Sequence, residues 1–418
     1  TYVGMPSHYP HWSYGKHYKR TKTLHRYNLP GLPYEMVINS NPCLAYLMKD
    51  NTLLLQILTI AHVYGHNDFF KNNRLFKLGT RAENTVEMFK NHANRIREYI
   101  QDPGIGYAKV EKILNAAHAI KYQVSRTIGE KRISDEEKKK EALKKLSKPV
   151  NEFSFLEPRT KEEEPLPDFK KIPFEPEEDM LLFIINYGKL ASWEKDILNI
   201  VREETLYFIP QIETKIMNEG WASFWHYTIL NKLNLPQGLH IEFLKRHNQV
   251  IRPHLGQLNP YYVGFKIFED IKNKNDGDLK KLFGIREVER DQSFIRRYLT
   301  QELCEEMNLF EYIKLGNNYV ITNVSDEDGW KEVRNTIANN AGMSGIPVIK
   351  VLEWVQSDNM LILEHDYDGR ELDISYAYET LKHVVDLWNA KVMLVTKIDN
   401  KRKVIACDEY KKVTLADA

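Results

Sequence analysis

The sequence contains little cysteine and no excess of charge of either sign. Its three cysteines, Cys43, Cys304 and Cys407, are far apart and form no CxxC pair. This spacing excludes a disulfide framework and a cysteine-based zinc knuckle, and it favours a reducing compartment, the cytoplasm. The 59 basic and 58 acidic side chains give a formal net charge of +1. We therefore expect no nucleic-acid partner, although a local basic patch is compatible with this composition.

Long apolar runs are also absent. The longest runs, such as 53–61 and 180–185, are shorter than the ~20 residues that a membrane-spanning helix needs. Residues 1–16 show no signal-peptide pattern, and no glycine-rich loop has the Lys-Ser/Thr ending of a phosphate-binding loop. These features predict a cytoplasmic protein without a transmembrane segment. With 418 residues, 42% of them hydrophobic, the chain is long enough for two or three domains.

The hydrophobic pattern divides the chain into a helical part and a smaller mixed part. Residues 1–129 and 179–300 predict two portions of one helical core, and the charged, proline-rich residues 130–178 predict a linker or surface excursion. The period then changes to two, with strands expected at 319–322, 348–355, 360–366, 392–397 and 403–407 and helices at 329–340 and 374–390. We therefore expect an α+β protein, in which a large, mainly α-helical N-terminal domain precedes a smaller C-terminal α+β module at 301–418.

Proline and glycine predict where helices are interrupted. Pro6, Pro10 and Gly15 argue against a long helix within residues 1–30. Pro210 is expected to kink or break the helix that begins near Trp193. The apolar run at 44–48 is expected to belong to the helical part.

Residues 53–73, LLLQILTIAHVYGHNDFFKNN, form the stretch around which we expect the functional site to be organised. They predict a buried helix in which His62 and His66 are one turn apart and project from the same face. Two histidines at this spacing are a common way for one helix to bind a metal ion. In zinc proteases a glutamate general base directly follows the first histidine, whereas here Val63 occupies that position. The base must therefore come from elsewhere.

The best third ligand lies far downstream, in MNEGWASFWHYTIL. Glu219 and His226 lie on one stripe of a predicted helix, and Lys215 precedes them on the same side. Trp221 and Trp225 flank this stripe, and aromatic side chains of that size are usually buried. The polar groups between them therefore need partners or a ligand.

Several blocks of the chain together resemble the stage V sporulation protein R family. They are SHYPHWSYGK, INSNPCLAYLM, AHVYGHNDFFKNN, YFIPQIETKIMNEGWASFWHY, LNPYYVGFKIFEDI and LDISYAYETLKHVVDLW, in this order, from about residue 5 to about residue 400. The resemblance implies a bacterial protein with a genetic link to the spore cortex, which is a modified peptidoglycan. It also implies a gene neighbourhood with a serine protein kinase and a von Willebrand-like protein as candidate partners, and additional residues before the HWS block.

A second resemblance is to gluzincin metallopeptidases. In those enzymes a histidine pair on one helix is completed by a glutamate in an EGWA-type helix, and His62, His66 and Glu219 fall on these positions. Val63 departs from the pattern, because gluzincins have their catalytic glutamate there.

Two functions are consistent with these observations. The first is a metal-dependent hydrolase or acyl transferase acting on an amide or peptide bond in peptidoglycan or its precursors. Zn²⁺ or another divalent transition metal would be bound by His62, His66 and Glu219.

The remaining catalytic roles have several candidates. His226 or Asp68 would act as the base, as a fourth ligand or as an orienting partner, and Lys215 or Tyr227 would polarise a carbonyl. The second function is a non-catalytic scaffold or regulatory protein that works with the kinase, in which the same side chains form a buried hydrogen-bond network.

Overall fold

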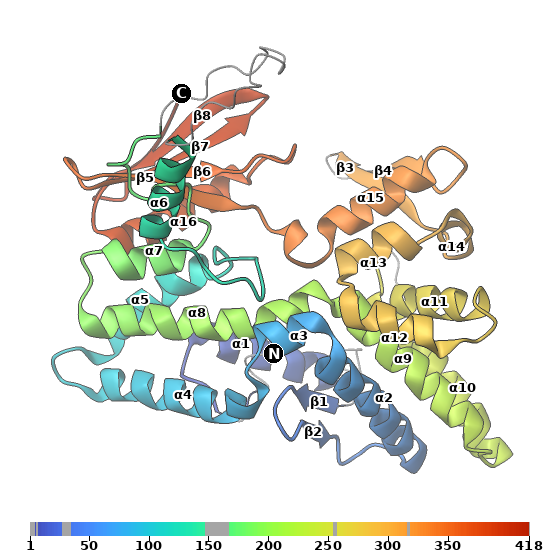
Figure 1. The fold of residues 1–418 in the computed structure, drawn as a ribbon. Helices are drawn as coiled ribbons and strands as arrows, with labels where there is room; N and C mark the ends of the chain where they lie inside the picture. The colour runs from blue at the N-terminus through green and yellow to red at the C-terminus, as the bar shows by residue number, and fades with distance from the viewer. Residues whose placement is uncertain are drawn as a thin grey trace. The chain divides into compact units, whose positions relative to one another are not determined.

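The computed structural model describes residues 5, 7–26, 35–146, 167–253, 257–315 and 318–417. The chain divides into two compact units, one formed by Thr1–Tyr107 and Glu203–Ile346, the other by Ala108–Arg202 and Pro347–Ala418. Figure 1 labels the elements of both. Residues 147–166 of the expected linker lie outside the described residues. None of the described helices is both long and apolar enough to cross a membrane.

The first unit is mainly helical. Its helices are α1 (Trp12–Arg26), α2 (Leu53–Asn72), α3 (Arg74–Gly79), α4 (Thr85–Gln101), α9 (Lys215–Lys232), α10 (Gln237–Val250), α11 (Pro260–Asn273), α12 (Leu279–Val288), α13 (Asp291–Tyr298), α14 (Gln301–Glu306) and α15 (Trp330–Asn340). Two short antiparallel hairpins accompany them, β1 (Glu35–Ile38) with β2 (Leu44–Leu47) and β3 (Phe310–Leu315) with β4 (Asn318–Val324).

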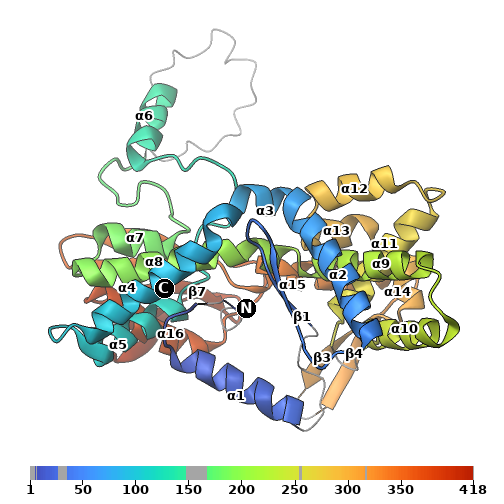
Figure 2. The ribbon, with the colours of Figure 1, turned by 90° about the horizontal axis from the view of Figure 1, so that it is seen from below.

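Helix α9 is at the centre of this unit, since it packs against α2 on one side and α11 on the other. Figure 2 shows the three helices from below. Large side chains fill the core between them, among them Phe69, Trp221, Phe268 and Phe294, all of which are fully buried. Burial of aromatic residues of this size is a major source of stability.

The ends of α2 follow from its sequence. Thr52 caps the N-terminus by accepting a hydrogen bond from the Leu55 backbone N–H at 3.3 Å. Asn73 ends the helix and caps α3 through a bond from the Leu75 N–H. The Asn73 amide also donates to the carbonyls of Arg286 and Glu289. It therefore joins the end of α2 to the end of α12.

The second unit combines helices with a five-stranded sheet. It contains α5 (Gly106–Ala119), α6 (Asp135–Leu146), α7 (Met180–Tyr187) and α16 (Ile374–Trp388), and α8 (Ser192–Glu213) passes from it into the first unit. The sheet order is β5 (Ile349–Val355), β6 (Met360–His365), β7 (Val392–Ile398), β8 (Lys401–Cys407) and β9 (Val413–Asp417). Only β6 and β7 pair in parallel, because α16 connects them.

The predicted α+β class is confirmed, with a large helical N-terminal region and a C-terminal sheet accompanied by helices. The helix predicted at 53–73 is also confirmed. The module expected at 301–418 spans both units. Helix α15 packs on α13, and its Ala338 belongs to the first unit's core, whereas β5 to β9 form the second unit's sheet.

Two local predictions were wrong. Residues 12–26 form α1 despite Gly15, because the two prolines precede the helix and Gly15 sits on an open face with no neighbour within 4 Å. The run at 44–48 forms β2, because β1 offers it a pairing partner. Helix α8 continues past Pro210 to Glu213, so it is not broken at Pro210, since proline removes a single N–H donor and later residues can still form helical bonds; the expected kink stays a prediction. Strands β3 and β9 were not expected.

Candidate metal centre

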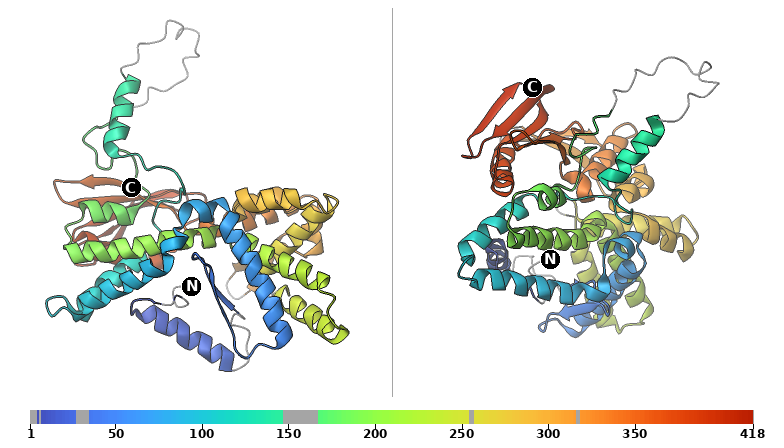
Figure 3. Two further views of the ribbon diagram at one scale, coloured as in Figure 1. Left: turned by 60° about the horizontal axis from the view of Figure 1, so that its bottom comes forward. Right: turned by 60° about the vertical axis from the view of Figure 1, so that its left-hand side comes forward.

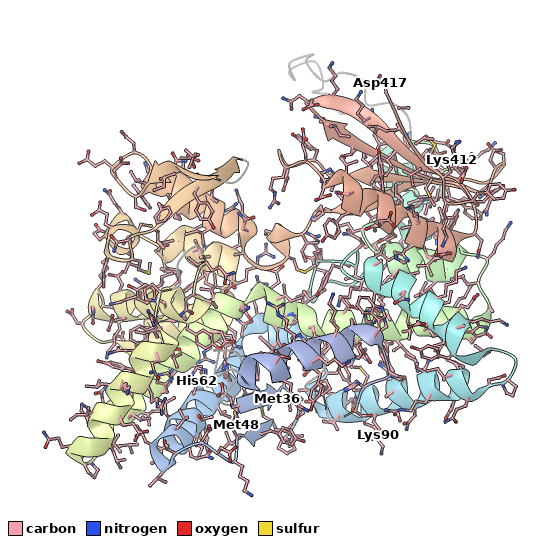
Figure 4. All side chains as sticks on the ribbon, turned by 180° about the vertical axis from the view of Figure 1, so that it is seen from behind. Met36, Met48, His62, Lys90, Lys412 and Asp417 are labelled. Carbon is pink, nitrogen blue, oxygen red and sulfur yellow. The ribbon has the colours of Figure 1, made fainter. Side chains whose placement is uncertain are left out.

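The two predicted halves of the site meet where α2 packs against α9. His62 and His66 lie one turn apart on α2, with ring centroids 4.6 Å apart. Glu219 approaches them from α9, and its Oε2 is 3.8 Å from His62 Nε2 and 3.5 Å from His66 Nε2. Figure 4 shows His62 on α2 from behind.

A fourth side chain, which the sequence did not reveal, joins this group. Glu35 is the first residue of β1, which lies beside α2 (Figure 3). Its Oε1 is 3.8 Å from His62 Nε2. The candidate ligand atoms of Glu35, His62 and His66 all lie within 4.8 Å of one another. Glu35 and Glu219 thus both lie close to His62 Nε2, and we call Glu35, His62, His66 and Glu219 the His-Glu cluster.

The spacing and chemistry of this cluster fit a divalent metal. Tetrahedral ligands at the ordinary Zn–N and Zn–O distances are about 3.4 Å apart, close to the 3.5 Å and 3.8 Å between Glu219 and the imidazoles. The carboxylates are acceptors, and a histidine nitrogen with a lone pair is an acceptor too. Acceptors that converge in a buried place repel one another unless a cation lies between them.

Burial shapes the acid–base properties of the cluster. His62 and His66 are 4% and 5% exposed. Burial lowers the pKa of His66 to about 4, so its imidazole is neutral near pH 7. Burial also raises the pKa of Glu35, and the charge of Glu219 adds to this. For Glu219, burial alone would raise the pKa, but His62, His66 and the Tyr261 hydroxyl outweigh it and lower the pKa.

Asn218 sets the orientation of His66. Its side-chain oxygen is 2.9 Å from His66 Nδ1, so His66 donates its ring proton there. The Nε2 lone pair of His66 is then left to face Glu219. A hydrogen bond from the distal ring nitrogen to a fixed acceptor is the usual way in which proteins orient a histidine ligand.

Tyr261 lies on the other side of His62. It is the second residue of α11, its ring is stacked on His62 at a centroid distance of 6.1 Å, and its hydroxyl is hydrogen-bonded to Glu219. The charge of Glu219, followed by burial, raises the pKa of Tyr261 well above its ordinary value. Tyr261 therefore keeps its proton and remains a donor.

Small residues allow the three helices to come this close. A Cβ on Gly65, which lies between the two histidines, would be 2.7 Å from the Cα of Ala222 on α9. A Cβ on Gly220 would be 2.4 Å from the backbone of Gly264 on α11. The backbones are thus in direct contact on either side of Glu219.

Of the predicted catalytic residues, His226 lies beside the cluster, whereas Asp68 has other partners. His226 is fully buried and close to the cluster, with its Nδ1 3.0 Å from His62 Nδ1. Asp68 instead accepts a hydrogen bond from Trp221 Nε1 at 2.9 Å and lies 3.5 Å from Arg286 Nε. It is therefore engaged in a separate group of side chains.

Lys215 and Tyr227 are not among the side chains whose contacts form the cluster. Lys215 is exposed at the first position of α9, one turn before Glu219. The Tyr227 ring packs on His247 at a centroid distance of 4.6 Å and on Phe265 at 5.5 Å. The roles expected for these two residues stay predictions.

Four residues in or around the cluster escaped the sequence analysis. Asn218 is adjacent to Glu219, and Tyr261 lies in the block LNPYYVGFKIFEDI, so the quoted motifs contained both. Glu35 and His247 had no such signal, because a strand residue and a helix residue far from each histidine share no spacing with them. Only the folded chain brings them to the site.

Comparisons with known proteins cover most of the chain and agree with one another. Residues 1–346 match the family described as SpoVR like protein, and residues 347–399 match the SpoVR-like C-terminal domain. The uncharacterized protein YcgB of Escherichia coli (strain K12) is 36% identical over 433 residues, covering 94% of this chain and 84% of YcgB. No solved structure matches the chain. The chain therefore belongs to the SpoVR family.

Proposed function

We propose that this protein is a metal-dependent enzyme that hydrolyses, or transfers the acyl group of, an amide or peptide-type bond. The convergence of His62, His66, Glu219 and Glu35 in one largely buried cluster is the observation that supports it most. A buried group of two imidazoles and two carboxylates is costly without a cation, and its donor atoms suit Zn²⁺ or another divalent transition metal.

In this proposal each residue of the cluster has its own chemical role. His62, His66 and Glu219 hold the metal, which when bound would lower the pKa of a water to about 7 and polarise a carbonyl. Glu35 accepts a proton as general base, which is the role of the glutamate directly after the first histidine in zinc proteases. Its raised pKa, caused first by burial, suits a group that must both take up and release a proton. Tyr261 donates a hydrogen bond beside Glu219.

The substrate in this proposal is peptidoglycan or one of its precursors. The family name refers to sporulation, and the family resemblance links these proteins to the spore cortex. We propose that the protein works in the bacterial cytoplasm on stem-peptide amide bonds, and that a serine protein kinase and a von Willebrand-like protein are its partners.

A scaffold or regulatory role is the second candidate, and one observation favours it. The two histidines of the cluster already have hydrogen-bond partners, since His66 is bonded to Asn218 and His62 to His226. A satisfied buried network can specify a core without any chemistry. In that case Val63 marks the loss of an ancestral activity, and the protein acts through its partner kinase.

Metal content separates the two candidates. Protein purified without a histidine tag and analysed for elements should contain about one metal ion per chain. His62→Ala and Glu219→Ala should lose it while keeping the native circular dichroism spectrum. His92→Ala is the matched control, because His92 is also buried in the first unit but is bonded to Glu203 and Glu204. Folded, metal-free wild-type protein would support the scaffold instead.

The role of Glu35 calls for a variant that keeps the metal. Glu35→Gln should retain the metal but lower stem-peptide cleavage by about 10²–10⁴-fold, whereas Asp68→Asn should not. The measurement is the muropeptide composition of cells in which the native gene is deleted and a gene for either variant is supplied. Restoration of the wild-type composition by Glu35→Gln would contradict the catalytic assignment.

A further inference from the structure

Three buried histidines form a hydrogen-bonded row that ends at the His-Glu cluster. His247 Nδ1 on α10 is 2.8 Å from His226 Nε2 on α9, and His226 Nδ1 is 3.0 Å from His62 Nδ1 on α2. Their exposed fractions are 2%, 0% and 4%. Three helices thus contribute one imidazole each to a single row.

Charge is excluded from the inner part of this row. Burial, reinforced by the charge of His62, lowers the pKa of His226 well below its ordinary value and that of His247 to about 4. The rings of Tyr227, Phe243 and Phe265 surround His247, with centroids between 4.6 Å and 6.1 Å away. In such an apolar place an imidazole is neutral near pH 7, so it carries one N–H and one lone pair.

A row in which each ring carries one proton can be connected in two directions. In the first, His62 Nδ1–H donates to His226 Nδ1, and His226 Nε2–H donates to His247 Nδ1. In the second, both bonds are reversed and His62 carries its proton on Nε2. That proton would then face the Glu35 and Glu219 oxygens, each 3.8 Å away, and His62 would have no lone pair for a cation. Only the first direction leaves the Nε2 lone pair of His62 facing the carboxylates, where a metal ion would lie between the acceptors.

We propose that His226 and His247 are positioning residues that fix the proton of His62 on Nδ1, so that its Nε2 lone pair is directed into the His-Glu cluster. Asn218 does the same for His66 through a single bond of 2.9 Å. His62 and His66 are therefore presented with the same ring nitrogen, one by an amide and one by a row of two histidines. This inference rests on the proposed function, because it concerns His62 as a metal ligand.

Nitrogen NMR of the full-length chain loaded with Zn²⁺ tests the order of the protons. With ¹⁵N-labelled histidine, the ring-nitrogen shifts distinguish the two neutral forms, and single substitutions assign them. His62 should carry its proton on Nδ1, and His226 and His247 should carry theirs on Nε2. A proton on Nε2 of His62, or on Nδ1 of His226, would overturn the proposal.

Zinc affinity, measured by competition with a chelator, tests the consequence. His226→Asn keeps a side-chain carbonyl that can accept from His62 and should bind Zn²⁺ within a few-fold of wild type. His226→Leu cannot accept and should bind about 10–100-fold more weakly. His92→Leu is the control for removal of a buried histidine and should not change the affinity. Equal affinity of His226→Leu and wild type would refute the positioning role.

The two readouts separate the inference from the proposed function. If the wild-type chain binds no Zn²⁺, the proposed function and the positioning role fail together. If Zn²⁺ binds but His226→Asn is as weak as His226→Leu, the positioning role is refuted while the metal site stands. Circular dichroism and thermal unfolding of each variant exclude a general loss of fold.

Discussion

At the residue scale, the position after His62 lacks a carboxylate, but the folded chain places one from another element beside this histidine. Val63, which follows His62, is buried in α2. Glu35 reaches the same histidine from β1, with 3.8 Å between Oε1 and Nε2. A motif defined by neighbours in the chain cannot detect Glu35, because a carboxylate can come from any element that the fold places nearby.

Gly65 offers a test of how closely the histidine pair must approach Glu219. A Cβ at this position would be 2.7 Å from the Cα of Ala222, a backbone atom that cannot move alone. Gly65→Ala should force α2 away from α9, destabilise the protein by about 1–3 kcal/mol and weaken metal binding. Urea unfolding and chelator competition measure the two effects.

The matched control for Gly65→Ala is Gly284→Ala. Gly284 is an exposed residue of α12, and a Cβ added to it would have no neighbour within 4 Å. Alanine there should stabilise the protein by about 0.5–1 kcal/mol, because glycine is a poor helix residue. If Gly65→Ala behaves like Gly284→Ala, close packing of α2 on α9 does not position the cluster.

At the scale of elements, α9 carries most of the cluster's partners and depends on a cap from another helix. Its N-cap residue Thr214 makes no side-chain cap bond. Asp291 of α13 takes that role, since its carboxylate accepts from the Ile216 N–H at 2.8 Å and the Met217 N–H at 2.9 Å. Burial raises the pKa of Asp291 to about 8, while the two N–H groups oppose this rise.

Asp291→Ala should therefore destabilise the protein by about 2 kcal/mol, because it leaves two buried N–H groups of α9 without acceptors. Asp291→Asn keeps one acceptor oxygen and should lose less. Asp278→Ala removes an ordinary exposed cap of α12 and should cost about 1 kcal/mol. Free energies of unfolding in urea would rank the three variants. A cost for Asp291→Ala no greater than that for Asp278→Ala would refute the capping role.

At the scale of the whole molecule, buried neutral histidines link stability to pH. The pKa values of His66 and His247 are lowered from 6.5 to about 4, chiefly by burial. Below pH 6.5 the unfolded chain takes up protons that the folded chain does not. Stability is therefore fully present above pH 6.5 and is lost as the pH falls toward 4.

The metal-free protein should accordingly lose on the order of 2 kcal/mol per histidine between pH 7 and pH 5. Urea unfolding across this range measures the slope. His247→Leu removes one of the two groups and should show a shallower slope than wild type, which separates the histidine effect from that of the carboxylates. Equal slopes would mean that His247 is not held neutral in the folded state.

The family and the broad class of the fold follow from the sequence alone. Several sequence blocks in a fixed order identified the SpoVR family, and hydrophobic periods of 3.6 and 2 indicated helices followed by strands. The helix with His62 and His66 was also predicted, because their spacing and the apolar run around them are local. Elements such as β1, β2 and α1 were not predicted, because their formation depends on pairing partners and on neighbouring helices.

The sequence by itself determined that two histidines share one face of α2, because helical geometry fixes that relation within a single element. Only the tertiary structure decided which groups meet them. It brought Glu219 to both Nε2 atoms, Glu35 to that of His62, and His226 to Nδ1 of His62. It turned Asp68 toward Trp221 instead. These relations depend on how α2, α9 and β1 pack together, and side chains far from the histidines determine that packing.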